Sequence, residues 1–130
     1  TMLKRGILNP SVLSLIARVR HTNTLVIADR GFPYWPQIET VDISLVDDLP
    51  TVRQVLAALR GEFVIGAAFM AEEFCRENGA AVQQEYADLL SPVTIAQEPH
   101  DEFKRRVPSA IGLIRTGDTT QYGNIILESA

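Results

Sequence analysis

Short apolar runs that alternate with helical segments constrain the fold of this chain more than any other feature of its sequence. The run at 24–28 (TLVIA) is rich in β-branched residues and is typical of a buried strand. The segment 51–61 instead repeats apolar residues at i, i+3, i+4 and i+7, which predicts an amphipathic helix. The run at 63–71 fits a buried strand, although periodicity alone also allows a helix there. Further strands are expected at 41–45, 93–96, 111–114 and 124–127, and further helices at 9–19, 80–90 and 99–106.

This order of elements predicts an α/β fold. Strands separated by helices of this length imply crossover connections and a mostly parallel sheet that is covered on both faces. We therefore expect a three-layer α/β/α sandwich with a mostly parallel, mixed sheet, formed by one domain over residues 1–130. A chain of this length can bury roughly two-thirds of the surface that its unfolded form exposes, so it needs no disulfide or structural metal.

Composition and charge exclude several classes of protein. The net charge of −4 argues against a nucleic-acid-binding protein, which would present a basic face. Cys75 is the one cysteine, so the chain can form neither an internal disulfide nor a cysteine-based metal cluster. The longest apolar runs are too short to span a membrane. These features predict a soluble, cytoplasmic protein that contacts neither nucleic acid nor membrane.

Polar residues that follow the apolar runs are the candidate functional residues. In open α/β sheets, ligands bind in the crevice beyond the carboxyl ends of the strands. Asp29 directly follows the 24–28 run, His100 follows the 93–96 run, and residues 115–118 follow the 111–114 run. Tyr122, Gly123 and Asn124 lie in the turn before the last strand, and His21 lies between the first helix and the first strand.

Each of these residues also has a simpler structural explanation. His21 at a helix end would hydrogen-bond the free carbonyls there, and this explanation is favoured by position alone. His100 could be a solvated residue of a first helical turn, and Asp29 a turn-former. Tyr122 and Asn124 could serve the turn alone. The candidates gain weight only if several of them converge on one place.

Other motifs give weaker or negative signals. The sequence lacks a glycine-rich dinucleotide fingerprint, a phosphate-binding loop and a nucleophile elbow. His21, Asp29 and His100 lack the spacing of a metal site, so we expect no metal. The adjacent carboxylates Glu72 and Glu73 are best explained as solvated, because neighbours in a strand or helix diverge. Tyr34–Trp35 could form a platform for stacking a sugar or could equally anchor a loop or an oligomer contact.

Three blocks of the sequence resemble the D-ribose pyranase / L-fucose mutarotase family. Residues 8–33 resemble its N-terminal block, with His-Thr-x-Thr followed by Asp-x-Gly-x-Pro. Residues 41–56 and 114–127 (IRTGDTTQYGNIIL) resemble its middle and C-terminal blocks. The blocks occur in the family's order and together extend over nearly the whole chain, which makes the resemblance specific.

The resemblance implies a cofactor-free isomerase that interconverts ring forms of a free, ribose- or fucose-like monosaccharide. It also implies a ring-shaped homo-oligomer, a pentamer or a decamer, with sites near subunit boundaries. His21 matches the family's proton-donor histidine, which would protonate the ring oxygen. Asp29, His100 and the turn formed by Tyr122, Gly123 and Asn124 match its sugar-binding positions, with Asp29 also favouring a charged His21.

The resemblance is divided between the two branches of the family. His100 in the stretch PHDEFK is similar to the pyranase branch, whereas the turn 122–124 (Tyr-Gly-Asn) is closer to the mutarotase branch than to the pyranase Tyr-Ala-Asn. Arg30 and Tyr34–Trp35 depart from the family pattern, so the sugar itself could differ from ribose. Two other hypotheses remain: a non-catalytic sugar-binding or transport-accessory protein, and a metal-dependent hydrolase that uses the two histidines.

Overall fold

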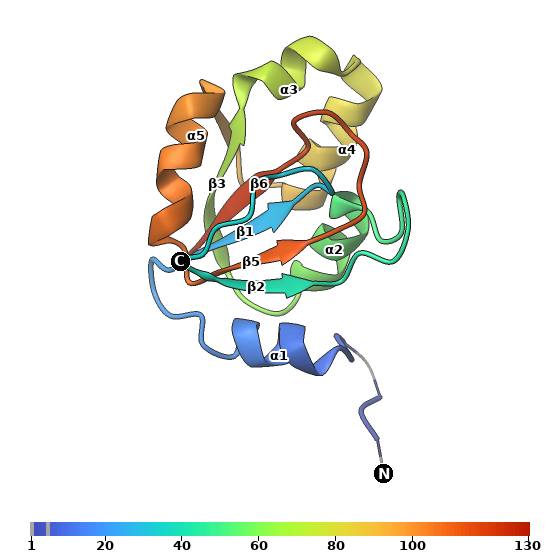
Figure 1. The fold of residues 1–130 in the computed structure, drawn as a ribbon, viewed down its shortest axis with the longest axis vertical. Helices are drawn as coiled ribbons and strands as arrows, with labels where there is room; N and C mark the ends of the chain where they lie inside the picture. The colour runs from blue at the N-terminus through green and yellow to red at the C-terminus, as the bar shows by residue number, and fades with distance from the viewer. Residues whose placement is uncertain (1, 5) are drawn as a thin grey trace.

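The computed structural model describes residues 2–4 and 6–130 and contains one six-stranded sheet in the order β2-β5-β1-β6-β3-β4 (Figure 1). The strands are β1 (Thr24–Ala28), β2 (Glu39–Asp42), β3 (Ile65–Ala71), β4 (Ile95–Glu98), β5 (Gly112–Arg115) and β6 (Ile125–Ser129). The helices are α1 (Pro10–Ile16), α2 (Val52–Leu59), α3 (Glu72–Glu77), α4 (Ala80–Leu90), α5 (His100–Arg106) and the 3₁₀ turn η1 (Val107–Ser109). Within the described part of the chain, every helix is too short or too polar to cross a membrane.

The sheet is mixed because one strand is reversed. β1, β2 and β5 are mutually parallel, and so are β3 and β4. β6 lies between β1 and β3 and is antiparallel to both (Figure 1). Helices connect β2 to β3, β3 to β4 and β4 to β5, whereas the chain passes from β1 to β2 through the loop 29–38 and enters β6 through the irregular segment 116–124. The predicted mostly parallel, mixed sheet is thus confirmed.

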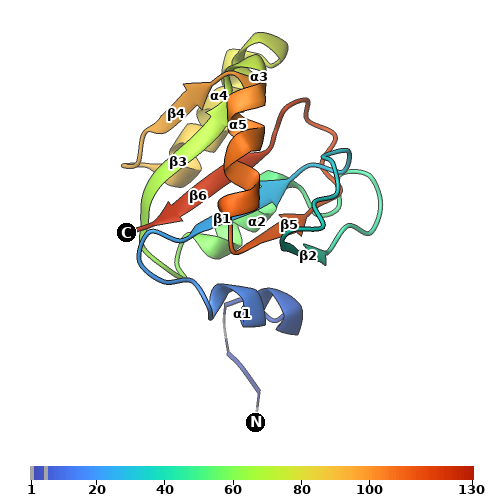
Figure 2. The same ribbon diagram turned by 60° about the vertical axis from the view of Figure 1, so that its left-hand side comes forward.

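Helices cover both faces of this sheet, as the predicted three-layer sandwich requires. The alternating side chains of β1 divide the core. Val26 and Ala28 belong to the cluster beneath α5, while Leu25 and Ile27 belong to the cluster beneath α1, α2 and α4. Figure 2 shows α5 alone in front of the sheet and α2 and α4 behind it.

Local signals account for the helix starts. The Asn9 side chain accepts hydrogen bonds from the backbone N–H groups of Ser11 and Val12 at 3.0 Å, which begins α1. Thr51 and Gln54 form a capping box at the start of α2. The predicted bounds are correct for β1 and α4, whose sequence patterns are bordered by clear breaks.

Several predicted bounds are wrong. β2 covers 39–42 rather than 41–45, because its partner strand, β5, ends at Arg115 opposite Asp42. α1 ends at Ile16 rather than at 19, and β3 begins at 65 rather than 63. β4, β5 and β6 each begin one or two residues later than expected, since pairing registers decide strand ends. The short helix α3 was not predicted, and it begins directly where β3 ends.

Candidate functional site

The strand directions bring distant segments to one edge of the sheet. The residues after β1, β4 and β5 lie at this edge because these strands share one direction. The residues before β6 lie there too, because β6 runs the opposite way. The segments that begin at Asp29, Pro99 and Thr116 therefore meet the turn 122–124.

A hollow of about 380 Å³ opens at this edge. It is lined by Asp29, Arg30, Gly31, Phe32, Pro33, His100, Asp118, Thr119, Thr120, Gln121, Tyr122 and Asn124. The structure thus brings together four of the residues that the sequence singled out: Asp29, His100, Tyr122 and Asn124. We call this hollow the edge pocket. Two other hollows are larger, at about 540 Å³ between α1 and β2 and about 570 Å³ between α4 and β4. Neither of these two hollows is lined by a histidine or by any of the candidate site residues, all of which the structure describes.

Asp29 and Asn124, which both line the pocket, are joined by two hydrogen bonds. The backbone N–H of Asp29 donates to Asn124 Oδ1 at 2.6 Å, and Asn124 Nδ2 donates to Asp29 Oδ2 at 3.3 Å. Burial raises the pKa of Asp29, and hydrogen bonds from Gly31, Phe32 and Asn124 partly oppose that rise. Both ends of the Asn124 amide are hydrogen-bonded to Asp29, so Asn124 orients the Asp29 carboxylate.

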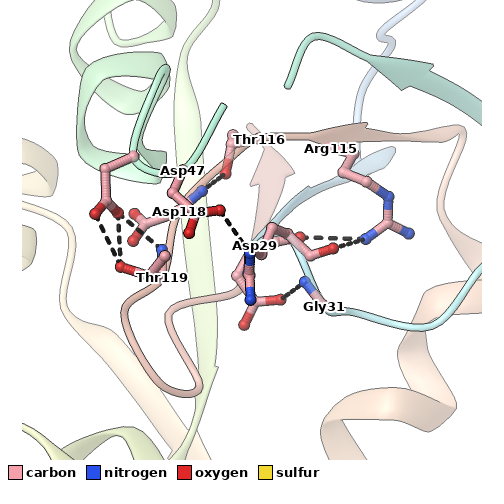
Figure 3. Close-up of polar contacts among 9 residues, drawn as sticks. Asp29, Gly31, Asp47, Arg115, Thr116, Asp118 and Thr119 are labelled. Atoms are coloured by element: carbon pink, nitrogen blue, oxygen red, sulfur yellow. Dashed lines mark hydrogen bonds and ion pairs between the residues drawn. The ribbon is translucent and has the colours of Figure 1, made fainter. Parts of the chain in front are cut away.

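Backbone contacts fix the loop that follows Asp29. Gly31 N–H donates to Asp29 Oδ1 at 3.0 Å, so the aspartate does act as a turn-former. The Arg115 guanidinium donates to the carbonyl oxygen of Asp29 at 3.2 Å (Figure 3). It also donates to the carbonyl oxygen of Pro33 at 3.2 Å. The Asp29 carboxylate therefore stabilises the turn that follows it through Oδ1, while its Oδ2 atom remains at the pocket.

Asp118 forms the floor of the edge pocket. It is fully buried, and its carboxylate accepts from Val52 N–H at 2.8 Å and from Thr120 N–H at 2.7 Å. Thr116 connects this loop to β1, because its hydroxyl donates to the carbonyl of Ala28 at 2.8 Å. The same hydroxyl accepts from Asp118 N–H at 3.1 Å (Figure 3). The start of α2 and the ends of β1 and β5 are thereby joined.

His100 is packed among aromatic rings. Its imidazole stacks on Phe103 at 6.1 Å between centroids and meets Tyr122 edge-on at 5.1 Å and Phe32 edge-on at 6.3 Å. Burial, followed by the positive charge of Lys104, lowers the pKa of His100. The His100 Nδ1 atom is buried and has no hydrogen-bond partner among the described residues. The pocket therefore contains an imidazole whose charged form is disfavoured and whose buried Nδ1 atom has unmet hydrogen-bonding capacity.

The turn before β6 needs glycine at 123 for a local reason. The Tyr86 hydroxyl donates to the Gly123 carbonyl at 3.1 Å. A Cβ atom at residue 123 would lie 2.8 Å from that same hydroxyl. The preceding residue, Tyr122, has a φ of 54°, which lies in the left-handed region. The buried Tyr86 thus explains Tyr-Gly-Asn in this chain, so the glycine does not by itself indicate which sugar is bound.

His21 lies at the other edge of the sheet. It precedes β1, whereas Asp29 follows it, and a five-residue strand spans about 17 Å at ~3.3 Å per residue. His21 is exposed, and α1 ends at Ile16, so its expected role at a helix end does not apply. Arg18 and Arg20 instead donate to the carbonyls of Ser14 and Ala17. One chain alone does not bring His21 to the edge pocket.

The structure decides between the alternatives left open for Tyr34–Trp35 and corrects the interpretation of Glu73. Tyr34 is exposed, and Trp35 packs against Phe32 with ring centroids 6.2 Å apart, so Trp35 is a loop anchor rather than part of the pocket lining. Glu73 is not solvated like its neighbour Glu72: its carboxylate accepts from the His100 backbone N–H at 3.1 and 3.2 Å. The sequence carried no signal for this contact, because it joins two separate helices.

The two histidines lie at opposite edges of the sheet and cannot bind one metal ion within a chain. Among residues 2–4 and 6–130, no group of three or more histidine, cysteine, aspartate or glutamate side chains is arranged to hold a metal. The geometry therefore gives no support to a metal-dependent hydrolase built on this pair.

Comparisons with known proteins agree with one another. The model of the RbsD / FucU transport protein family matches residues 2–130. The D-ribose pyranase of Geobacillus thermodenitrificans (strain NG80-2) is 39% identical over 128 residues, which are 98% of this chain and 96% of that protein. The D-ribose pyranase of Corynebacterium glutamicum (strain ATCC 13032) is 39% identical over 129 residues, with 98% and 97% covered.

Solved structures show the same fold. Bacillus subtilis RbsD complexed with D-ribose superposes with a TM-score of 0.92 at 33% identity, covering 99% of this chain and 98% of that one. The fucose mutarotase of Streptococcus pneumoniae, in complex with L-fucose, has a TM-score of 0.79 at 17% identity, with 98% of both chains covered. The second likeness concerns the fold alone.

Proposed function

Because this chain belongs to the RbsD / FucU transport protein family, we propose that it interconverts ring forms of a free monosaccharide, and that the monosaccharide is D-ribose. The relatives at 39% identity are D-ribose pyranases, and the structure at 33% identity was solved with D-ribose. The mutarotase solved with L-fucose is only 17% identical. Both the family and the nearer similarities therefore favour ring exchange of a pentose.

The observation that supports this proposal most directly is the convergence of Asp29 and His100 on the edge pocket. The two residues belong to loops that follow different strands, and each has a pKa shifted by burial. Groups of this kind in one concave site are the usual mark of a functional site. A hollow of about 380 Å³ is also of the right order for one small sugar.

The chemistry requires only proton transfer. To open a hemiacetal ring, a proton must reach the ring oxygen while the anomeric hydroxyl loses one, and closing through another hydroxyl reverses both transfers. Asp29 would accept a hydrogen bond from a sugar hydroxyl, and neutral His100 would donate or accept another. Tyr122 would also hydrogen-bond a sugar hydroxyl, and Asn124 would hold the Asp29 carboxylate in place.

We assign the proton donor to His21 of a neighbouring copy of this chain. His21 is exposed at the sheet edge opposite its own pocket, so a second copy can present it. A loop beside the pocket offers a contact surface: Leu45, Val46 and Leu49 are exposed by 74%, 61% and 47%. Asp48 of this loop accepts from Thr119, a pocket residue, at 2.9 Å. A homo-oligomer whose sites are shared between copies would explain both features.

Saturation-transfer NMR on D-ribose tests the proposed function. Wild-type protein is expected to accelerate exchange between pyranose and furanose signals. Asp29→Asn is expected to lower the exchange rate about tenfold to hundredfold, since a charged acceptor is lost from a sugar hydroxyl. Asp88→Asn, on an exposed part of α4, is the control and should leave the rate unchanged.

The outcomes separate the competing hypotheses. Binding of ribose without any catalysed exchange would contradict the isomerase and indicate a non-catalytic sugar-binding protein. Exchange of fucose but not ribose signals would keep the reaction and correct the sugar. Full activity of Asp29→Asn would remove the edge pocket from the mechanism.

A further inference from the structure

A half-buried carboxylate outside the edge pocket contacts one of its residues. Glu73 lies in α3, and its side chain is 21% exposed. Both of its carboxylate oxygens accept from the backbone N–H of His100, at 3.1 and 3.2 Å. This contact joins α3, which directly follows β3, to the start of α5, which follows β4.

Among the residues that the structure describes, Glu73 provides the side-chain cap at the start of α5. The N-cap residue of this helix is Pro99, whose side chain makes no capping hydrogen bond. Glu73 takes this role from another helix, and so fixes the backbone from which the imidazole projects. The ring itself is held by Phe103, Tyr122 and Phe32, which contact it through their faces and edges. Backbone and ring of His100 are thus restrained by different partners.

We propose that Glu73 is a positioning residue for His100, which it anchors at the edge pocket for sugar binding. This inference rests on the proposed function, because it assumes that His100 contacts the sugar. Glu73 is not among the residues that line the pocket, so it acts through His100 rather than on the sugar.

Charge adds a second consequence of the same contact. The groups that face the imidazole are Lys104 and Asp101 on its own helix, Glu73 on α3 and Asp29 after β1. Burial and Lys104 lower the pKa of His100, whereas the Glu73 carboxylate raises it. Arg76, at 3.9 Å from the Glu73 carboxylate, would lose its partner if the charge were removed. Loss of the Glu73 charge should therefore lower the pKa of His100 further.

The test compares three variants by NMR. Glu73→Ala removes both the acceptor and the charge, Glu73→Gln keeps an acceptor oxygen and removes the charge, and Glu72→Gln changes an exposed neighbour. The chain has only two histidines, so the His100 ring proton can be titrated with His21 as an internal reference. Ribose exchange is measured in parallel over a range of sugar concentrations.

Glu73→Ala is expected to raise the half-saturating ribose concentration about fivefold, as for a lost helix cap, with little change in the limiting rate. Glu73→Gln should retain most of the affinity, and both variants should lower the pKa of His100 while Glu72→Gln does not. Glu73 variants that match wild type in both measurements would overturn the inference. His100→Ala with full exchange activity would instead refute the role of His100 in the proposed function, and the titration would still report whether Glu73 contacts it.

Discussion

Complementation between two impaired variants gives a direct test of a site shared between copies. His21→Ala should lower ring exchange by about 10²–10⁴-fold, the usual contribution of one acid–base group. Asp29→Asn instead impairs the pocket and lowers the rate about tenfold to hundredfold. Within one chain the two residues are separated by the length of β1, about 17 Å at ~3.3 Å per residue, whereas proton transfer needs contact at hydrogen-bond distance.

The expected recovery follows from counting sites. In a random mixed assembly, an intact site needs His21 from an Asp29→Asn chain and a pocket from a His21→Ala chain, so about one quarter of the sites are restored. The two variants are co-expressed with different tags, and doubly tagged assemblies are assayed by saturation-transfer NMR on D-ribose. The matched control mixes Asp29→Asn with His100→Ala, because both residues lie in the same chain's pocket and no intact site can form.

Two results would refute this reasoning. A His21/Asp29 mixture whose exchange rate stays at that of the single variants would show that both residues act from one chain. Equal recovery in the control mixture would show that the recovered activity does not report shared sites.

Three further predictions concern the pocket and its support. Asn124→Ala should lower the free energy of unfolding by about 1–3 kcal/mol in urea titrations, because it removes a buried side chain and leaves the part-buried Asp29 N–H without its acceptor; a cost near zero would mean that water replaces the amide. Because the pKa of His100 is lowered in the folded state, the unfolded chain takes up its proton first as pH falls. The thermal midpoint should therefore fall more between pH 7 and pH 5 in wild type than in His100→Gln, and equal falls would contradict the shift. Gly123→Ala should destabilise by about 1–3 kcal/mol through its clash with the Tyr86 hydroxyl. Tyr86→Phe should then lower the free energy of unfolding less in the Gly123→Ala background than in the wild-type protein, because it removes the clashing hydroxyl. A double-mutant cycle would detect this difference, and strictly additive effects would exclude the clash.

Part of the fold could be read from local sequence because local interactions decide it. The β-branched run 24–28 forms β1, the periodic segment after Thr51 forms α2, and α4 has the predicted bounds. Strand ends were less predictable. β2 stops at Asp42 because β5 offers no further partner, which no property of residues 43–45 reveals.

The position of Asp29 and His100 in the pocket also followed from sequence, since both come after strands of common direction. What the tertiary structure decided is the pairing of remote segments. The reversed β6 places Asn124 against Asp29 although the two are 95 residues apart. Its direction was not encoded by any local pattern, because strand direction depends on which neighbours complete the hydrogen-bonding of the sheet.

Local sequence was therefore enough to predict the kinds of element, their order and the residues that can transfer protons or bind hydroxyl groups. The folded chain was needed to show that Glu73 contacts His100 and that His21 lies at the opposite edge of the sheet from its own pocket. Helix and strand propensities act over a few residues, so they can be read from local sequence. The contacts between distant segments depend instead on the direction in which whole strands enter the sheet.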